Sequence, residues 1–143
     1  MTDSAIAHTQ LPNSADAGAA LGKLIASTFK GERPDTLILF ASPTYDYPTL
    51  LQVLNRACGP IIMVGCSSSG EFSTHGNHDD SACAMALRSS QMQFAAGIGR
   101  GLRSDRATAA KALVSLFQGL RARPRRGTGR SWACSRWAPG ARH

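Results

Sequence analysis

The residues between positions 65 and 71 hold the densest set of groups in this chain that could do chemistry. In order they are Gly65, Cys66, Ser67, Ser68, Ser69, Gly70 and Glu71. A serine with small residues two positions before and two positions after it is typical of a nucleophile elbow, and Ser68 has this spacing. Cys66 is a second candidate, because a thiol at a strand end can be activated by amides or a cation facing it. One hypothesis is therefore a small hydrolase.

The sequence around Ser68 argues against an elbow. An elbow places a helix after the nucleophile, whereas residues 71–76 show no helical periodicity. The sequence also offers no residue that can be identified as the general base. A loop of small residues leaves backbone amides and hydroxyl groups open to a docked molecule, which favours binding over catalysis. We therefore predict no catalytic residue and no enzymatic activity, with the serine or cysteine hydrolase as the alternative.

Two histidines raise the question of a metal site. His75 and His78 are followed by two aspartates, and Cys66 or Cys83 could complete a zinc set. Their spacing matches no standard structural zinc site, and the segment that carries the histidines is polar. We predict no metal and no cofactor.

Two continuous apolar runs, 37–41 and 61–64, predict strands that are buried on both faces of a sheet. Between them, Asp46 is a good helix N-cap, Pro48 fits the first turn, and Gly59-Pro60 ends the helix. A strand, a helix and a strand within about thirty residues predict a right-handed parallel crossover. Both strands then end at the same edge of the sheet, where α/β proteins usually bind their ligands.

The loops that follow these two strands form the predicted ligand-binding site. The first loop contributes Ser42, Tyr45 and Asp46, and the second contributes Gly65, Cys66, Ser67, Ser68, Ser69, Gly70 and Glu71. The carboxylate of Glu71 could pair with the ammonium group of a ligand, and the phenol of Tyr45 could hydrogen-bond to the ligand. The alternative is that these two residues serve as a capping carboxylate and a half-buried tyrosine.

The segment before the first apolar run predicts one helix. Asn13 or Ser14 caps it, its apolar residues fall on one face, and Gly31 closes it. That face consists of Ala17, Leu21, Leu24, Ile25 and Phe29. Residues 1–13 are predicted to be a flexible leader.

The segments after residue 80 predict a hairpin and a further helix. Apolar and small residues alternate over 82–87 and again over 92–98. A cap at residues 104–105 begins a helix whose apolar face holds Ala110, Leu113, Val114 and Phe117. The expected fold is α/β, a mixed sheet with parallel central strands, an antiparallel hairpin and three covering helices.

The net charge of +7 comes from the end of the chain. Residues 1–120 contain nine Lys and Arg and all nine Asp and Glu, so this part is neutral. The remaining seven basic residues are arginines after residue 120. The basic isoelectric point therefore describes a tail and not a basic face of a domain. We do not expect nucleic acid as a partner.

No apolar run approaches the roughly 18 residues that a membrane-spanning helix needs. The N-terminus carries an acid where a signal peptide needs a positive charge, and no apolar segment follows. The four cysteines are widely spaced, as expected for reduced thiols. We predict a cytoplasmic protein without a membrane partner.

Two motifs resemble the N-terminal part of FIST domains. One is Leu-Ile-Leu-Phe-Ala-Ser-Pro at 37–43, followed by Tyr45 and Asp46, and the other is Val-Gly-Cys-Ser-Ser-Ser-Gly-Glu at 64–71. The resemblance covers residues 14–120. FIST domains are sensory modules of bacterial signal transduction. The resemblance implies a non-catalytic domain that binds a small ligand, with amino acids as the proposed class. It also implies an output partner such as a histidine kinase, a chemoreceptor or a cyclic-dinucleotide enzyme.

Residues 121–143 depart from this resemblance. They contain no Lys, Asp, Glu, Ile, Val or Leu, where a FIST domain should continue with a buried strand. Their Arg, Gly, Ala, Pro and Trp content is what GC-rich DNA yields when it is read out of frame. We therefore expect an incomplete FIST domain over 14–120 and a disordered tail that is a frameshift product. The alternatives are a tail that binds nucleic acid and a truncated product without function.

Overall fold

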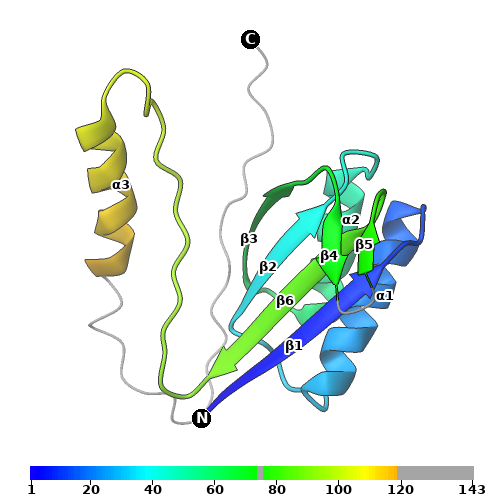
Figure 1. The fold of residues 1–143 in the computed structure, drawn as a ribbon. Coiled ribbons are helices and arrows are strands. Elements are labelled where there is room, and N and C mark those ends of the chain that lie inside the picture. Colours follow the sequence, from blue (N-terminus) through cyan, green and yellow to red (C-terminus); the bar gives the residue numbers. More distant parts are fainter. Residues whose placement is uncertain (74–75, 119–143) are drawn as a thin grey trace.

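The computed structural model describes residues 1–73 and 76–118. Its elements, in order, are β1 (Thr2–Thr9), α1 (Ser14–Thr28), β2 (Thr36–Ala41), α2 (Tyr47–Cys58), β3 (Ile62–Ser67), β4 (Glu71–Ser73), β5 (Gly76–His78), β6 (Ala82–Ser89) and α3 (Arg106–Gln118). Four strands form one mixed sheet in the order β1-β6-β2-β3, and β4 and β5 form a separate antiparallel pair (Figure 1). The expected α/β class with a mixed sheet is confirmed. The expected tail at 121–143 lies outside the described residues.

The unit β2-α2-β3 forms as the sequence predicts. β2 and β3 are parallel, with Leu37 opposite Met63 and Ala41 opposite Ser67. The helix between them begins where Asp46 caps it. Both strands therefore end at one edge, which we call the carboxyl edge.

β3 differs from its prediction in length and position. It continues through Gly65, Cys66 and Ser67, which the sequence pattern places in a loop. It also lies at the end of the sheet, so its side chains are partly or fully exposed instead of buried on both faces. The reason is that β2 has β6 as its second neighbour, which leaves β3 paired on one side only.

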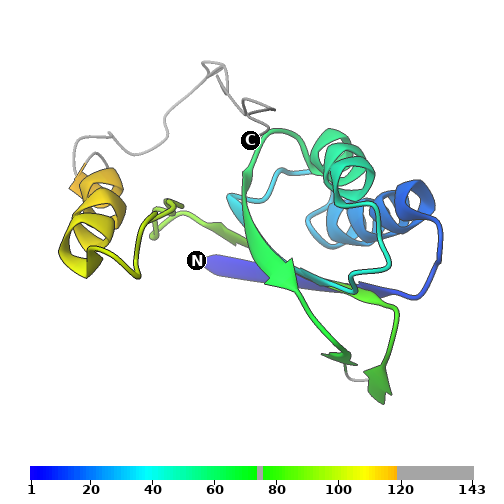
Figure 2. The same cartoon turned by 90° about the horizontal axis from the view of Figure 1, so that it is seen from above.

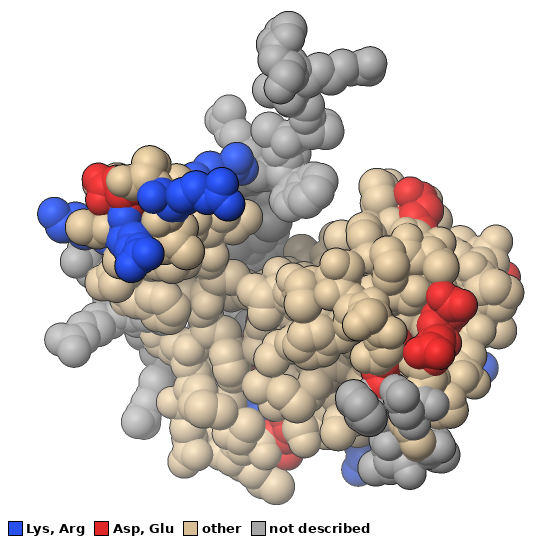
Figure 3. All heavy atoms as spheres, turned by 45° about the horizontal axis from the view of Figure 1, so that its top comes forward, with Lys and Arg blue, Asp and Glu red and all other residues tan. Residues whose placement is uncertain are grey.

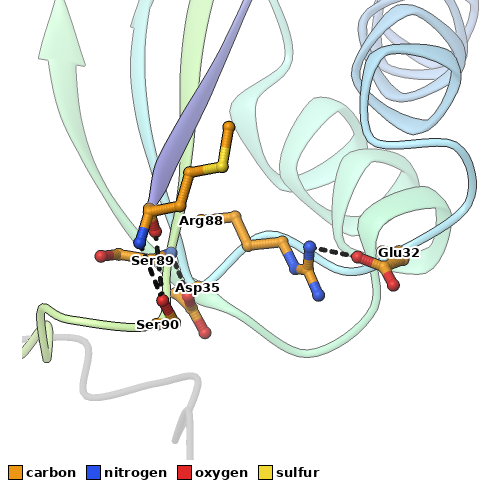
Figure 4. Close-up of polar contacts among 6 residues, drawn as sticks. Glu32, Asp35, Arg88, Ser89 and Ser90 are labelled. Atoms are coloured by element: carbon orange, nitrogen blue, oxygen red, sulfur yellow. Dashed lines mark hydrogen bonds and ion pairs between the residues drawn. The ribbon is translucent and has the colours of Figure 1, made fainter.

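The start of the chain is a strand, and the prediction of a flexible leader is wrong. β1 pairs with β6 along its whole length, from Thr2 opposite Ser89 to Thr9 opposite Ala82. Beyond the last pair, the Met1 ammonium group donates to the Ser90 hydroxyl at 3.0 Å (Figure 4).

Further contacts hold the end of β6 to the turn before β2. The amide of Ser89 donates to the Asp35 carboxylate at 2.8 Å, and Arg88 forms an ion pair with Glu32 (Figure 4). This edge, where β2 begins and β6 ends, is opposite to the carboxyl edge, and we call it the amino edge.

The predicted hairpin between 82–87 and 92–98 is wrong as well. β6 has β1 on one side and β2 on the other, so neither of its edges can accept a further strand. Residues 92–100 form neither helix nor strand.

Helices α1 and α2 cover one face of the sheet (Figure 2). The fully buried side chains between the helices and the sheet include Leu21 and Ile25 of α1, Leu50 and Leu54 of α2, and Leu37 of β2. The two helices approach closely because α1 carries Gly22, where a Cβ would lie 2.3 Å from the Cβ of Ala57. The predicted stripe of α1 is correct except for Leu24, which is exposed.

The third helix does not cover the sheet as predicted. Figures 1 and 2 show α3 set apart from the sheet at the end of an extended segment, residues 90–105, which we call the arm. Of the side chains of its predicted apolar face, Val114 is 57% exposed and Phe117 is 50% exposed. Within residues 1–73 and 76–118, no helix combines the length and apolar character needed to cross a bilayer.

Candidate functional site

The structure brings the two halves of the predicted site together at the carboxyl edge. Ala41 lies opposite Ser67 in the parallel register, and the Ser68 amide donates to the Ala41 carbonyl at 3.1 Å. The segments Ser42–Asp46 and Ser68–Glu71 therefore leave the sheet side by side.

Glu71 is the central polar group of this edge. Its side chain is buried, although a carboxylate is rarely buried without a charged partner. One carboxylate oxygen accepts a hydrogen bond from the Ser68 hydroxyl and the other accepts one from the Ser81 hydroxyl. Ser81 is fully buried, and sequence reasoning missed it because nothing marks a serine before an alanine-rich strand as functional.

Ser42 and Tyr45 are buried and bonded within the protein. The Ser42 hydroxyl donates to the Asp80 carboxylate at 3.1 Å, and the Tyr45 hydroxyl donates to the Leu11 carbonyl at 2.9 Å. These contacts tie the β1-α1 loop and the start of β6 to the β2-α2 loop. Tyr45 is thus buried, more than the half-buried alternative predicts, and its hydroxyl is bonded within the protein.

The remaining predicted residues divide between structural and exposed positions. Asp46 is a helix cap, because its carboxylate accepts from the Thr49 amide at 3.2 Å. Gly65 is required by close packing, since a Cβ there would lie 1.8 Å from the Leu39 carbonyl oxygen. The side chains that face solvent are Cys66, Ser67 and Ser69, while Ser68 and Gly70 are half-buried.

Removing the cap of α2 should have a modest effect. We expect Asp46→Ala to lower the free energy of unfolding by about 1 kcal/mol, the usual contribution of an N-cap side chain. Asp79→Ala removes an exposed carboxylate near the same edge and serves as the control. Urea unfolding followed by circular dichroism compares the two, and equal losses would contradict the capping role.

The carboxyl edge is strongly acidic. The segments 9–22, 42–55 and 65–87, which surround it, contain no Lys or Arg. They hold five acidic residues, namely Asp16, Asp46, Glu71, Asp79 and Asp80. Basic side chains gather instead over α3 and its arm (Figure 3). The field at the carboxyl edge therefore favours a cation over an anion.

Two hollows lie at the amino edge and not at the predicted site. One, of about 140 Å³, lies between the C-terminal ends of α1 and α2 beside Arg33 and Gly59. The other is a shallow hollow of about 660 Å³ next to Thr2–Ser4 and Arg88. Neither is lined by a predicted site residue. We base the site on the buried carboxylate, because shallow hollows occur on most protein surfaces whereas buried carboxylates are rare.

The geometry does not match a nucleophile elbow. The segment after Ser68 leads into strand β4 and not into a helix, and the Ser68 hydroxyl donates to a carboxylate. His78 is engaged elsewhere: its Nδ1 lies 2.7 Å from Gln10 Nε2, and its ring centroid lies 4.8 Å from that of His8. In the described part of the chain, no three His, Cys, Asp or Glu side chains are grouped so that they could hold a metal ion. His75 lies outside the described residues.

Alkaline pH should destabilise the fold. Burial raises the pKa of the Cys58 thiol, and burial together with Glu71 raises the pKa of Cys83, above the ordinary 9.0. Burial, followed by Glu71 and Asp80, raises the pKa of Tyr45 above the ordinary 10.0. The unfolded chain loses these protons first, so stability is full below the ordinary values and falls as pH rises through them.

Urea unfolding at neutral pH and at about pH 10 tests this expectation. Cys58→Val removes one ionisable thiol and should flatten the decline. A stability that does not change over this range would contradict the burial of these three groups.

The model of the FIST N domain family matches residues 35–136. Because this is more than half of the chain, the chain belongs to that family, whose members are sensory domains of signal transduction. The match begins just before β2, later than the resemblance suggested, and continues past residue 120. Comparison with curated proteins and with solved structures gave no match.

Proposed function

We propose that this FIST domain binds a small polar ligand with an ammonium group, such as a free amino acid, at the carboxyl edge. The occupied state is then read by an output protein, such as a histidine kinase, a chemoreceptor or a cyclic-dinucleotide enzyme. The proposal includes a cytoplasmic setting, supported by the free Cys58, Cys66 and Cys83. The observation that carries the proposal is the buried Glu71 carboxylate held by two neutral hydroxyls.

A buried carboxylate is costly to desolvate unless a positive charge or strong hydrogen bonds compensate it. Within the part of the chain that the structure describes, an ion pair joins Arg88 and Glu32 at the amino edge, opposite to the carboxyl edge where Glu71 lies. Within residues 1–73 and 76–118, the hydrogen bonds to Glu71 come from hydroxyl groups, which carry no charge. A ligand ammonium would supply the missing charge and form charge-assisted hydrogen bonds, which are stronger than neutral ones.

The surroundings of Glu71 suit a zwitterionic ligand. Ser81, which is fully buried, contacts the Glu71 carboxylate from the protein interior. Ser68, which is half-buried, contacts it from the side nearer to solvent. An ammonium group would enter by displacing the Ser68 hydroxyl. The small residues Ser69 and Gly70 leave their backbone amides accessible to the carboxylate of the same ligand.

Isothermal titration with a panel of free amino acids and their N-acetyl derivatives tests the proposal. At least one free amino acid should give a heat of binding, and its N-acetyl form should give none, because acetylation removes the ammonium charge. Equal binding of both forms would show that the Glu71 carboxylate does not recognise the ammonium group of the ligand. The absence of binding across the whole panel would contradict the ligand class.

A further inference from the structure

One face of the sheet is apolar and exposed. α1 and α2 cover the opposite face, and the strand registers align Ile6, Met85, Ile38 and Val64 in a row across all four strands. Ile6 is 68% exposed and Val64 is 41% exposed. Phe40, in the next row of the same face, is exposed as well. A continuous apolar surface of this kind marks an interaction site.

The segment 97–118, which we call the hook, is a preformed unit. The arm packs on α3 at Gly99, where a Cβ would lie 2.7 Å from the Ala109 carbonyl oxygen, and the Ala109 side chain is buried. The Asp105 carboxylate caps the helix by accepting from the Thr108 amide at 3.0 Å. The hook stands clear of its own sheet (Figures 1 and 2), with Val114 and Phe117 exposed.

The hook and the rest of the domain have opposite charges. The hook contains four basic residues and one acidic residue, a net charge of +3. Residues 1–90 contain five basic and eight acidic residues, a net charge of −3. The basic residues lie on the arm and on the first half of α3, at positions 100, 103, 106 and 111. The exposed apolar residues of α3, Leu113, Val114 and Phe117, lie on its second half.

We propose that the chain forms a two-fold symmetric dimer in which the hook of each copy lies across the apolar row of the other copy's sheet. A helix of 13 residues is about 20 Å long, which matches strands of six residues. Its apolar half would cover Ile6, Met85, Ile38 and Val64, and its basic half would point to the acidic carboxyl edge. A second copy is the proposed occupant, because the hook stands clear of its own sheet (Figures 1 and 2) and its charge is opposite to that of residues 1–90.

Molar mass measured by light scattering on the full-length chain tests the dimer. The unmodified chain should have the mass of two copies, and Val114→Glu combined with Phe117→Glu should reduce this mass two-fold. The matched control, Ala112→Glu with Ser115→Glu, adds the same charge to α3 outside the apolar stripe and should keep the mass of two copies. A single-chain mass for the unmodified protein, or two copies in the Val114/Phe117 variant, would overturn the proposal.

A mixing experiment distinguishes exchange from other arrangements. Ile6→Lys with Val64→Lys blocks the sheet face, and both residues are exposed, so the fold should survive. Each blocked variant alone should be a single chain, but a mixture of the sheet-blocked and hook-blocked chains should regain the mass of two copies through one intact contact. A mixture that stays at the single-chain mass would show that the hook of one copy does not contact the sheet of another, and would overturn the exchange.

Discussion

Gly65→Val is expected to separate β3 from the sheet and to lower the free energy of unfolding by more than about 3 kcal/mol, the upper end of the usual range for overpacking. A Cβ at this position would lie 1.8 Å from the Leu39 carbonyl oxygen and 2.8 Å from its carbon. Both atoms belong to the backbone of β2, so they cannot rotate away as a side chain would. The parallel pairing must yield instead, which also exposes Met63, now packed against the core.

Gly31→Ala is the matched control for this prediction. No atom lies within 4 Å of a Cβ at Gly31, but its φ of +81° favours glycine. The control should therefore lower stability by about 1 kcal/mol through backbone strain alone. Urea unfolding of both variants gives the comparison. A Gly65→Val protein as stable as the Gly31→Ala protein would show that β3 is not held by close contact with β2.

Glu71→Gln is expected to weaken binding of the ammonium ligand by about 30-fold or more, because it removes one charge from a buried pair. The fold should survive this change. The glutamine side chain has nearly the same shape, and its oxygen can still accept a hydrogen bond from Ser68 or Ser81. Titration calorimetry measures the affinity, and circular dichroism confirms that the variant is folded.

Asp79→Asn is the control for Glu71→Gln. It removes an acidic charge from the same edge at an exposed position. It should therefore change the affinity only slightly, through the electrostatic field of the edge, which salt screens. A folded Glu71→Gln protein that binds as well as Asp79→Asn would show that the buried carboxylate does not contact the ligand.

The sequence predicts the β2-α2-β3 unit well because its signals are local. Asp46 and Pro48 begin the helix, Gly59 ends it, and two apolar runs flank it. Each of these features acts within a few residues, so no knowledge of the remaining chain is needed.

The two errors about the start of the chain and about the hairpin have one origin, which is that β1 occupies an edge of β6. The side chains of β1 that face the helices include Ala5 and Ala7, opposite Ala86 and Ala84 of β6. Alanines fit there because α1 packs closely, but small alanines separated by Ser4, Ile6 and His8 do not give the apolar and polar alternation of a strand. The alternation over 92–98 predicts a strand beside β6, but β1 occupies the edge of β6 that such a strand would need.

The sequence predicts that the loops after β2 and β3 lie side by side, but not the polar contacts that these loops make. Parallel pairing is sufficient to bring the β2 and β3 loops together, and the structure confirms this. The contact of Ser81 with Glu71 joins the first residue of β4 to the residue just before β6. No sequence spacing specifies such a contact, because it depends on how the β4-β5 pair folds back on the sheet.

The position of the ligand is the most direct test of this account. A nuclear magnetic resonance titration of the labelled chain with free amino acids reports which backbone amides respond. We predict changes concentrated at Ser67–Glu71, with smaller ones at Ser42–Asp46. Changes concentrated instead at Thr2–Ser4 and Arg88, around the hollow of the amino edge, would contradict a site built on Glu71.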